Sequence, residues 1–157
     1  MKLKEIIQED FANYKRPSMF LGTCNCDWKC CKENAACKCQ NSPFANYPVV
    51  EMDDDKLVDN YMKNQWTHAV VIGGLEPMLQ FPELKQFIGK LRAKTDDDVV
   101  IYTGYYPEEV EGKIKELKQY NNIIVKFGRY KPGYEPHLDK VLGVELANPE
   151  QFAEKIS

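Results

Sequence analysis

Residues 68–102 read HAVVIGGLEPMLQFPELKQFIGKLRAKTDDDVVIY and contain two predicted strands with a helix between them. The strands, 68–72 and 98–102, are continuous apolar runs, which is typical of strands that are covered on both faces. Pro82 suits the first turn of the helix. Four apolar residues follow it at helical spacing: Leu84, Phe87, Ile88 and Leu91. This order predicts two parallel strands joined by a helical crossover.

The segments on either side continue this alternation of strands and helices. Four more strands are predicted, over residues 18–23, 47–52, 122–127 and 141–146. Four more helices are predicted, over residues 2–14, 54–64, 107–117 and 148–156. The chain has 157 residues, which is enough for one domain with a sizeable core. We therefore predict a single α/β domain over residues 1–157 with a mainly parallel sheet.

Composition and charge narrow the class of protein. The net charge is −3 and no run of Lys and Arg stands out, so no groove for nucleic acid is expected. Residues 1–5 are charged and lack the apolar core of a signal peptide. The longest apolar runs have about five or six residues, whereas a membrane-spanning helix needs about 20. These features predict a soluble protein of the cytoplasm that binds neither membranes nor nucleic acid.

The most unusual segment is 24–41, which reads CNCDWKCCKENAACKCQN and contains all six cysteines of the chain. A disulfide framework would spread its cysteines along the chain, and a reducing cytosol disfavours disulfides, so a metal site is predicted. Thiolates are soft ligands that suit zinc or iron–sulfur clusters. The segment has neither a CxxC pair nor a histidine. This pattern argues against a standard zinc ribbon and favours an iron–sulfur cluster.

Glycine-containing turns follow three of the predicted strands directly, at Gly73-Gly74, Thr103-Gly104 and Gly128. The cysteine-rich segment directly follows another predicted strand. In open parallel sheets, ligands gather beyond the carboxyl ends of the strands. We therefore expect these four segments to converge on one edge of the sheet and to form the functional site there.

Several motifs together resemble the radical S-adenosylmethionine (SAM) superfamily, and in particular the activating enzymes of anaerobic ribonucleotide reductase. Cys26-x3-Cys30 matches the first two cysteines of the family's CxxxCxxC signature. Glu33 stands where the third cysteine is expected, and Cys39-Gln-Asn resembles the Cys-His-Asn tripeptide that often carries it. The resemblance implies that Cys26, Cys30 and Cys39 bind three irons of a [4Fe–4S] cluster.

Three further motifs extend the resemblance over most of the chain. The turn Gly-Gly-Leu-Glu-Pro at residues 73–77 resembles the family's GGEP motif with one leucine inserted. Glycines allow the backbone to approach a ligand closely, and a carboxylate suits the ammonium group of SAM. Residues 101–109 resemble the family's YTGYT-x-EE stretch, and residues 127–130 are similar to its DGRF segment. The resemblance implies that SAM is bound by Gly73, Gly74, Glu76, Pro77, Thr103 and Gly104.

The same resemblance implies a fold and a reaction. The fold is a partial TIM-like (βα)6 barrel. In the reaction, the reduced cluster passes one electron to the sulfonium of SAM, which splits into methionine and a 5′-deoxyadenosyl radical. That radical abstracts a hydrogen atom from a substrate, which for this chain would be a separate glycyl-radical protein. The electron would come from a flavodoxin or a ferredoxin, and no catalytic acid–base residue is required.

Two other functions remain open on the sequence. Cys31 and Cys37 could replace Cys39 as the third ligand, and the additional thiols, including that of Cys24, could supply a fourth. A fourth thiolate would occupy the iron that SAM needs, and the protein would then be an iron–sulfur binding or electron-transfer module. Alternatively, the cysteines bind zinc and stabilise an interaction domain.

Overall fold

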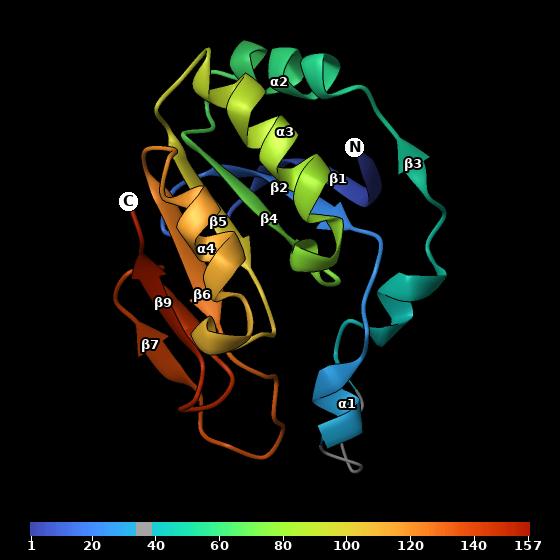
Figure 1. Cartoon of the computed structure of the whole chain (residues 1–157), viewed down its shortest axis with the longest axis vertical. Coiled ribbons are helices and arrows are strands. Elements are labelled where there is room, and N and C mark those ends of the chain that lie inside the picture. The colour runs from blue at the N-terminus through green and yellow to red at the C-terminus, as the bar shows by residue number, and fades with distance from the viewer. Residues whose placement is uncertain (34–38) are drawn as a thin grey trace.

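The structure, a computed structural model, describes residues 1–33 and 39–157 and is built around a seven-stranded sheet (Figure 1). In their order across the sheet, the strands are β3 (Val50–Glu51), β1 (Lys2–Asp10), β2 (Ser18–Thr23), β4 (Ala69–Gly74), β5 (Asp98–Tyr102), β6 (Ile123–Phe127) and β9 (Phe152–Lys155). The four central strands β2, β4, β5 and β6 run parallel. On either side of them, β1, β3 and β9 pair antiparallel. The prediction of an α/β fold with a mainly parallel sheet therefore holds for the centre of the sheet.

Three helices cover one face of the sheet (Figure 1), namely α2 (Asp54–Lys63), α3 (Phe81–Arg92) and α4 (Glu111–Leu117). Their buried side chains, such as Leu57, Phe87 and Leu117, share one core with every second strand residue, such as Val70 and Ile101. All three helices lie on the same face because the parallel strands follow one another in sequence order and each crossover is right-handed.

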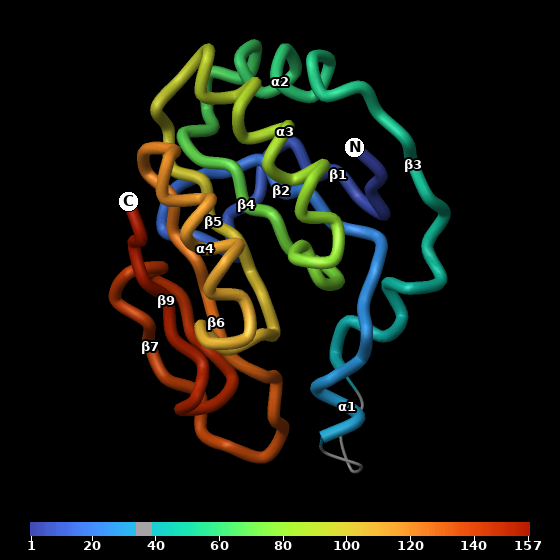
Figure 2. Tube along the Cα trace, viewed as in Figure 1, coloured from blue at the N-terminus to red at the C-terminus, as the bar shows by residue number. Residues whose placement is uncertain are grey.

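The other face of the sheet has a second, smaller core. Val71 and Val100 pack there with Tyr14, Leu142 and Leu146. Part of this cover is a separate two-stranded sheet of β7 (His137–Asp139) and β8 (Val144–Leu146). Figure 2 shows the last part of the chain, with β7 and β9, running along the side of the molecule next to β6. Because both faces are covered, the central strands are continuous apolar runs.

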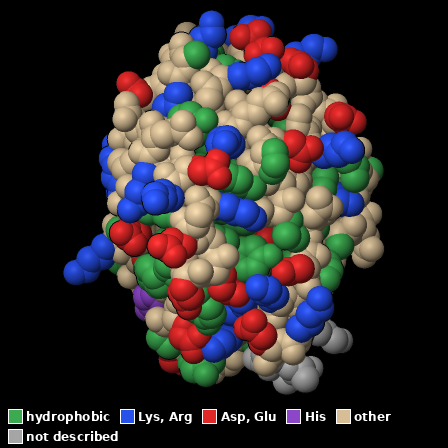
Figure 3. All heavy atoms as spheres, in the orientation of Figure 1, with side chains coloured by type: hydrophobic (Ala, Val, Ile, Leu, Met, Phe, Trp, Pro, Cys, Tyr) green, Lys and Arg blue, Asp and Glu red, His purple; other side chains and the backbone are tan. Residues whose placement is uncertain are grey.

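The described surface carries charges of both signs. On the face shown in Figure 3, acidic and basic side chains are interspersed over the helices rather than separated by sign. Among the described residues, no helix is both long enough and apolar enough to cross a membrane.

The predicted partial barrel of six parallel strands is not confirmed. The sheet is open, and four of the six predicted strands run parallel within it. Residues 47–52 contribute only the two-residue β3, and residues 141–146 contribute β8 to the separate small sheet. Antiparallel β1 and β9 flank the parallel strands and occupy the positions that further parallel strands would need in a barrel.

Two of the predicted helices are wrong. Residues 2–14 begin with the strand β1, and residues 148–156 contain the strand β9. Without them, β2 and β6 would each leave a row of unpaired backbone groups at an edge of the parallel sheet, and such groups require partners. Pairing with β2 and β6 outweighs the local helical spacing of apolar residues. The other predicted helices and strands are found within a few residues of their expected bounds, apart from the shortened β3 and β8.

Candidate iron–sulfur site

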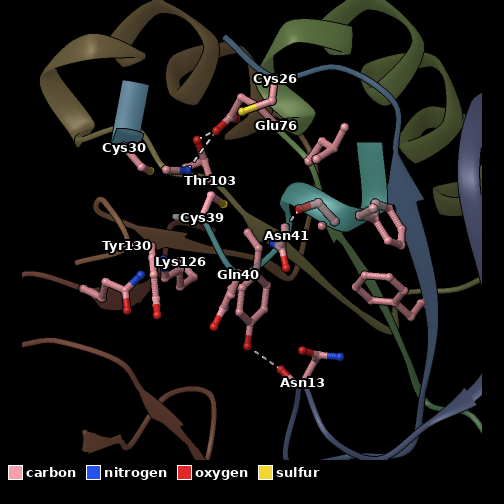
Figure 4. Close-up of a pocket in the computed structure, with 18 of the residues that line it drawn as sticks. Asn13, Cys26, Cys30, Cys39, Gln40, Asn41, Glu76, Thr103, Lys126 and Tyr130 are labelled. Atoms are coloured by element: carbon pink, nitrogen blue, oxygen red, sulfur yellow. Dashed lines mark hydrogen bonds between the residues drawn. The ribbon is translucent and has the colours of Figure 1, made fainter. Parts of the chain in front are cut away.

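The carboxyl ends of β2, β4, β5 and β6 meet at one edge of the sheet and border a pocket of about 370 Å³ (Figure 4). The turns after all four strands contribute to its lining, as the sequence predicts. Among the predicted site residues, Pro77 does not line the pocket; it is buried at the start of the short helix η2 (Pro77–Gln80). The others all line it: Cys26, Cys30, Cys39, Gly73, Gly74, Glu76, Thr103 and Gly104.

The end of β4 is a glycine turn that contacts the segment after the cysteines. Gly74 has a φ of +81°, in the left-handed region that favours glycine. A Cβ at Gly74 would lie 2.7 Å from the ring of Phe44, so a larger residue would collide with that ring. The side-chain amide of Asn41 donates a hydrogen bond to the carbonyl of Gly74 at 2.7 Å. The segment that follows Cys39 is thereby held on the glycine turn.

Glu76 joins the turn after β4 to the turn after β5. Its side chain is buried, with 5% of the residue exposed. Oε1 accepts hydrogen bonds from the N–H of Met78 (3.0 Å) and the hydroxyl of Thr103 (2.7 Å), and Oε2 accepts one from the N–H of Gly104 (2.8 Å). Burial raises the pKa of Glu76, although the three hydrogen bonds favour its charged form. The carboxylate is therefore fixed in place before any ligand enters.

Cys26, Cys30 and Cys39 come from the loop after β2 and lie together with Glu76 and Thr103 in the upper part of Figure 4. Cys30 belongs to the five-residue helix α1 at residues 29–33. Its sulfur packs against the turn after β5, since a Cβ at residue 104 would lie 3.4 Å from the Cys30 Sγ. A glycine at that position leaves room for the thiol.

The protonation of the thiols follows from their burial. Burial raises the pKa of Cys26 to about 11, and the N–H of Trp28, which donates to the Cys26 Sγ at 3.3 Å, only partly offsets this effect. Burial also raises the pKa of Cys39. Both thiols are therefore neutral at pH 7 in the metal-free protein. A metal group that binds here must displace their protons, so its affinity should increase with pH.

The remaining cysteines occupy other positions. Cys24 and Cys31 do not line the pocket. Cys31 nevertheless lies next to Cys30 in helix α1 and is half-buried. Cys37, the other alternative for the third ligand, lies outside the described residues.

The donor set fits an iron–sulfur cluster. Within residues 1–33 and 39–157, no three His, Cys, Asp or Glu side chains are grouped closely enough to hold a single metal ion. A [4Fe–4S] cluster binds each thiolate through a different iron, so its ligands stand further apart than those of one ion. Cys26, Cys30 and Cys39 provide three soft donors around one opening, which is the arrangement that such a cluster requires.

Polar side chains that the sequence analysis did not identify attach the cysteine loop to the sheet. The hydroxyl of Tyr105 donates a hydrogen bond to the carboxylate of Asp27 at 2.7 Å. The ammonium of Lys29 lies 2.9 Å from the carboxylate of Glu109 and also over the ring of Tyr105. Asp27 and Lys29 flank Trp28, whose φ of 60° marks a sharp turn of the loop. The turn between two proposed ligands is thus fixed from both sides.

Arg129 adds the strongest of these attachments from the turn after β6. Its buried guanidinium donates to both carboxylate oxygens of Glu33 at 3.0 Å, to Glu109 at 2.6 Å and to the carbonyl of Gly104. A fork of this kind is the geometry that guanidinium and carboxylate groups favour. The hydrogen bond from Arg129 lowers the pKa of Glu109 to about 2. Residues 127–130, which are similar to the DGRF segment, indicate that this turn belongs to the site. They do not predict Glu33 as the partner of Arg129, because the two residues lie 96 positions apart in the sequence.

Comparison with known proteins agrees with the thiol chemistry of the pocket. A model of the family described as 4Fe-4S single cluster domain matches residues 15–143, which include the cysteine loop and the four parallel strands. No curated protein and no solved structure matches the chain. The match spans well over half of the chain and supports the predicted [4Fe–4S] cofactor. The chain therefore belongs to the 4Fe-4S single cluster domain family.

Proposed function

We propose that this protein holds a [4Fe–4S] cluster on Cys26, Cys30 and Cys39 and uses it to cleave SAM reductively. The observation that carries the proposal is the shared pocket. The three thiols line the same opening as the glycine turn of β4 and the fixed carboxylate of Glu76. Membership in a family that binds a 4Fe-4S cluster is compatible with a redox enzyme. The residues beside the thiols would bind a ligand that carries an ammonium group.

The chain's own residues would bind and orient the methionine end of SAM. The carbonyls of Gly73 and Gly74 already accept hydrogen bonds from Thr23 and Asn41, and the second lone pair of each would accept from the ammonium of SAM. Glu76 would add a negative charge whose position is fixed by Thr103 and Gly104. Three protein thiolates leave one iron free for SAM. When bound, the cluster would supply the electron that splits SAM into methionine and a 5′-deoxyadenosyl radical.

The proposal extends to two partners. Residues 101–109 resemble the activating enzymes of anaerobic ribonucleotide reductase, and this resemblance favours a glycyl-radical protein as the substrate of the radical. A reduced flavodoxin or ferredoxin would supply the electron. A candidate substrate protein should acquire a glycyl-radical EPR signal only when SAM, reductant and the cluster-loaded protein are all present.

A second function is favoured by one observation. Cys31 directly follows Cys30 in helix α1 and is half-buried, so a fourth thiol is available beside a proposed ligand. If Cys31 ligated the fourth iron, SAM could not reach it. The protein would then bind a cluster and transfer electrons without cleaving SAM.

The test begins with anaerobic reconstitution and analysis of iron and sulfide. The EPR spectrum of the dithionite-reduced protein is then recorded with and without SAM, and 5′-deoxyadenosine is quantified by chromatography. Perturbation of the spectrum by SAM together with 5′-deoxyadenosine formation is the expected result. An EPR spectrum that SAM does not change would favour the electron-transfer function. Stoichiometric zinc with no iron would exclude both SAM cleavage and electron transfer, and would favour a zinc-stabilised interaction domain.

A further inference from the structure

Lys126 is a buried cation in the wall of the pocket. It lies near the end of β6, and 6% of the residue is exposed. Its side chain lines the same pocket as Cys30, Cys39 and Glu76 (Figure 4). The only hydrogen bond that its ammonium donates within the described residues goes to the carbonyl of Gly128, at 3.0 Å.

Within the described residues, the ammonium has fewer partners than it can bind. An ammonium has three N–H donors, and one of them is used. None of the ion pairs among residues 1–33 and 39–157 includes Lys126. A buried charge without a partner costs several kcal/mol. Burial accordingly lowers the pKa of Lys126 to about 8, while the charges of Cys30 and Glu76 act against that shift. The side chain is still mostly cationic at pH 7.

The nearby anions show what Lys126 lacks. Glu76 already accepts three hydrogen bonds from its own neighbours and makes no ion pair with Lys126. Cys30 lines the same pocket as Lys126, and a metal that binds a thiol replaces its proton. A metal-bound thiolate set would therefore supply the negative charge that the ammonium does not find in the metal-free protein.

We propose that the Lys126 ammonium is the counter-charge of the thiolate-ligated cluster and raises its reduction potential. The inference rests on the cluster ligation of the proposed function but not on SAM cleavage. An oxidised cluster on three thiolates carries one net negative charge, and one electron from a low-potential donor adds a second without any bond or proton changing place. A fixed cation stabilises the more negative state, so it favours reduction.

The test is a redox titration of the reconstituted protein with dithionite, followed by EPR and without SAM. Lys126→Gln and Lys126→Met remove the charge, and Lys126→Arg keeps it. Lys113→Gln is the matched control, because the ammonium of Lys113 also donates to a backbone carbonyl, that of Met78 at 2.6 Å, but does not line the pocket. The expected result is a midpoint potential that is more negative in both neutral variants and close to wild type in Lys126→Arg and Lys113→Gln.

The other outcomes are equally defined. Unchanged potentials in the neutral variants overturn the inference. The titration is then repeated with SAM, and a shift that appears only in this repeat also overturns the inference, since the ammonium would then serve the ligand. If the neutral variants lose the cluster while Lys126→Arg retains it, iron analysis supports the counter-charge directly. Loss of the cluster in all three Lys126 variants overturns the inference, because the shape of the side chain rather than its charge would then be required. Failure of the wild-type protein to assemble a cluster would instead refute the proposed function.

Discussion

The two sides of the pocket are built in different ways. The turns after β4 and β5 continue directly from buried strands, and Glu76 joins them through three hydrogen bonds. The described part of the cysteine loop contains one helix of five residues, and none of these residues is fully buried. Its thiols are half-buried, and polar pairs with Tyr105, Glu109 and Arg129 attach it to the sheet.

The difference suggests which side depends on a ligand. The glycine and glutamate turns keep their geometry because the hydrophobic core holds the strands that carry them. The described part of the cysteine loop contributes no residue to either hydrophobic core, so its position should depend on charged contacts and on the metal group proposed to bind its thiols. Variants of the two sides should therefore separate loss of the cluster from loss of stability.

Substitution of the proposed ligands should have the largest effect. We expect iron content far below wild type in each of three variants, Cys26→Ser, Cys30→Ser and Cys39→Ser. Loss of a side chain that only hydrogen-bonds to a metal ligand already lowers metal affinity about 10–100-fold, and loss of a ligand itself should cost more. Cys24→Ser is the control, because Cys24 does not line the pocket. Iron and sulfide analysis after anaerobic reconstitution is the measurement. Full cluster content in Cys39→Ser would move the third ligand to Cys31 or Cys37.

Removal of the Arg129 guanidinium should have the next largest effect. Arg129→Met removes the bonds to Glu33 and Glu109, and the unfolding free energy of the metal-free protein should fall by about 2–3 kcal/mol, as expected for charged hydrogen bonds of a buried group. Denaturation with urea measures this, together with cluster content. Lys85→Met breaks an exposed pair with Glu116 and should change little. Equal stability of the two variants would show that the loop is not attached through Arg129.

The opposite side of the pocket should respond through stability and retain the cluster. In Glu76→Gln the amide oxygen can still accept from Thr103, but the amide nitrogen cannot accept from the N–H of Gly104. We expect a loss of about 1 kcal/mol, since relief from burying a charge offsets part of the lost bonding. Glu108→Gln, at an exposed position, is the control. Iron content as low as in the cysteine variants would contradict the division between the two sides.

The sequence was sufficient for the parts of the fold that depend on local pattern. The four parallel strands and their helices were predicted because their apolar runs and helical spacing are encoded within each segment. Their shared direction predicts that Cys30, Glu76 and Thr103 lie at one edge of the sheet, where the structure has them. The roles of these residues in binding a cluster or SAM stay predictions.

The parts that depend on partners outside their own segment could not be predicted. β1 and β9 are strands because β2 and β6 need neighbours, and their own sequences give no such signal. The contact of Arg129 with Glu33 joins residues that only the completed sheet brings together. The burial of Lys126 is equally hidden, since a lysine at the end of a strand is ordinarily expected at the surface.

The smallest expected effect concerns pH, and it has opposite signs for Glu109, which pairs with Lys29 of the cysteine loop, and for Glu76 of the opposite side. Arg129 lowers the pKa of Glu109 from 4.5 to about 2, so the stability that Glu109 contributes is present above its unfolded pKa and is lost as the pH falls toward 2. Burial raises the pKa of Glu76, so its contribution is instead present at low pH and declines as the pH rises through its folded pKa. Because solvent screens the partly exposed Glu109, the loss should be below about 1 kcal/mol. Urea unfolding of metal-free wild type and Glu109→Gln at pH 7 and pH 3 measures it: the difference between them should shrink at pH 3, and a constant difference would show that the ion pair does not stabilise the attachment of the loop.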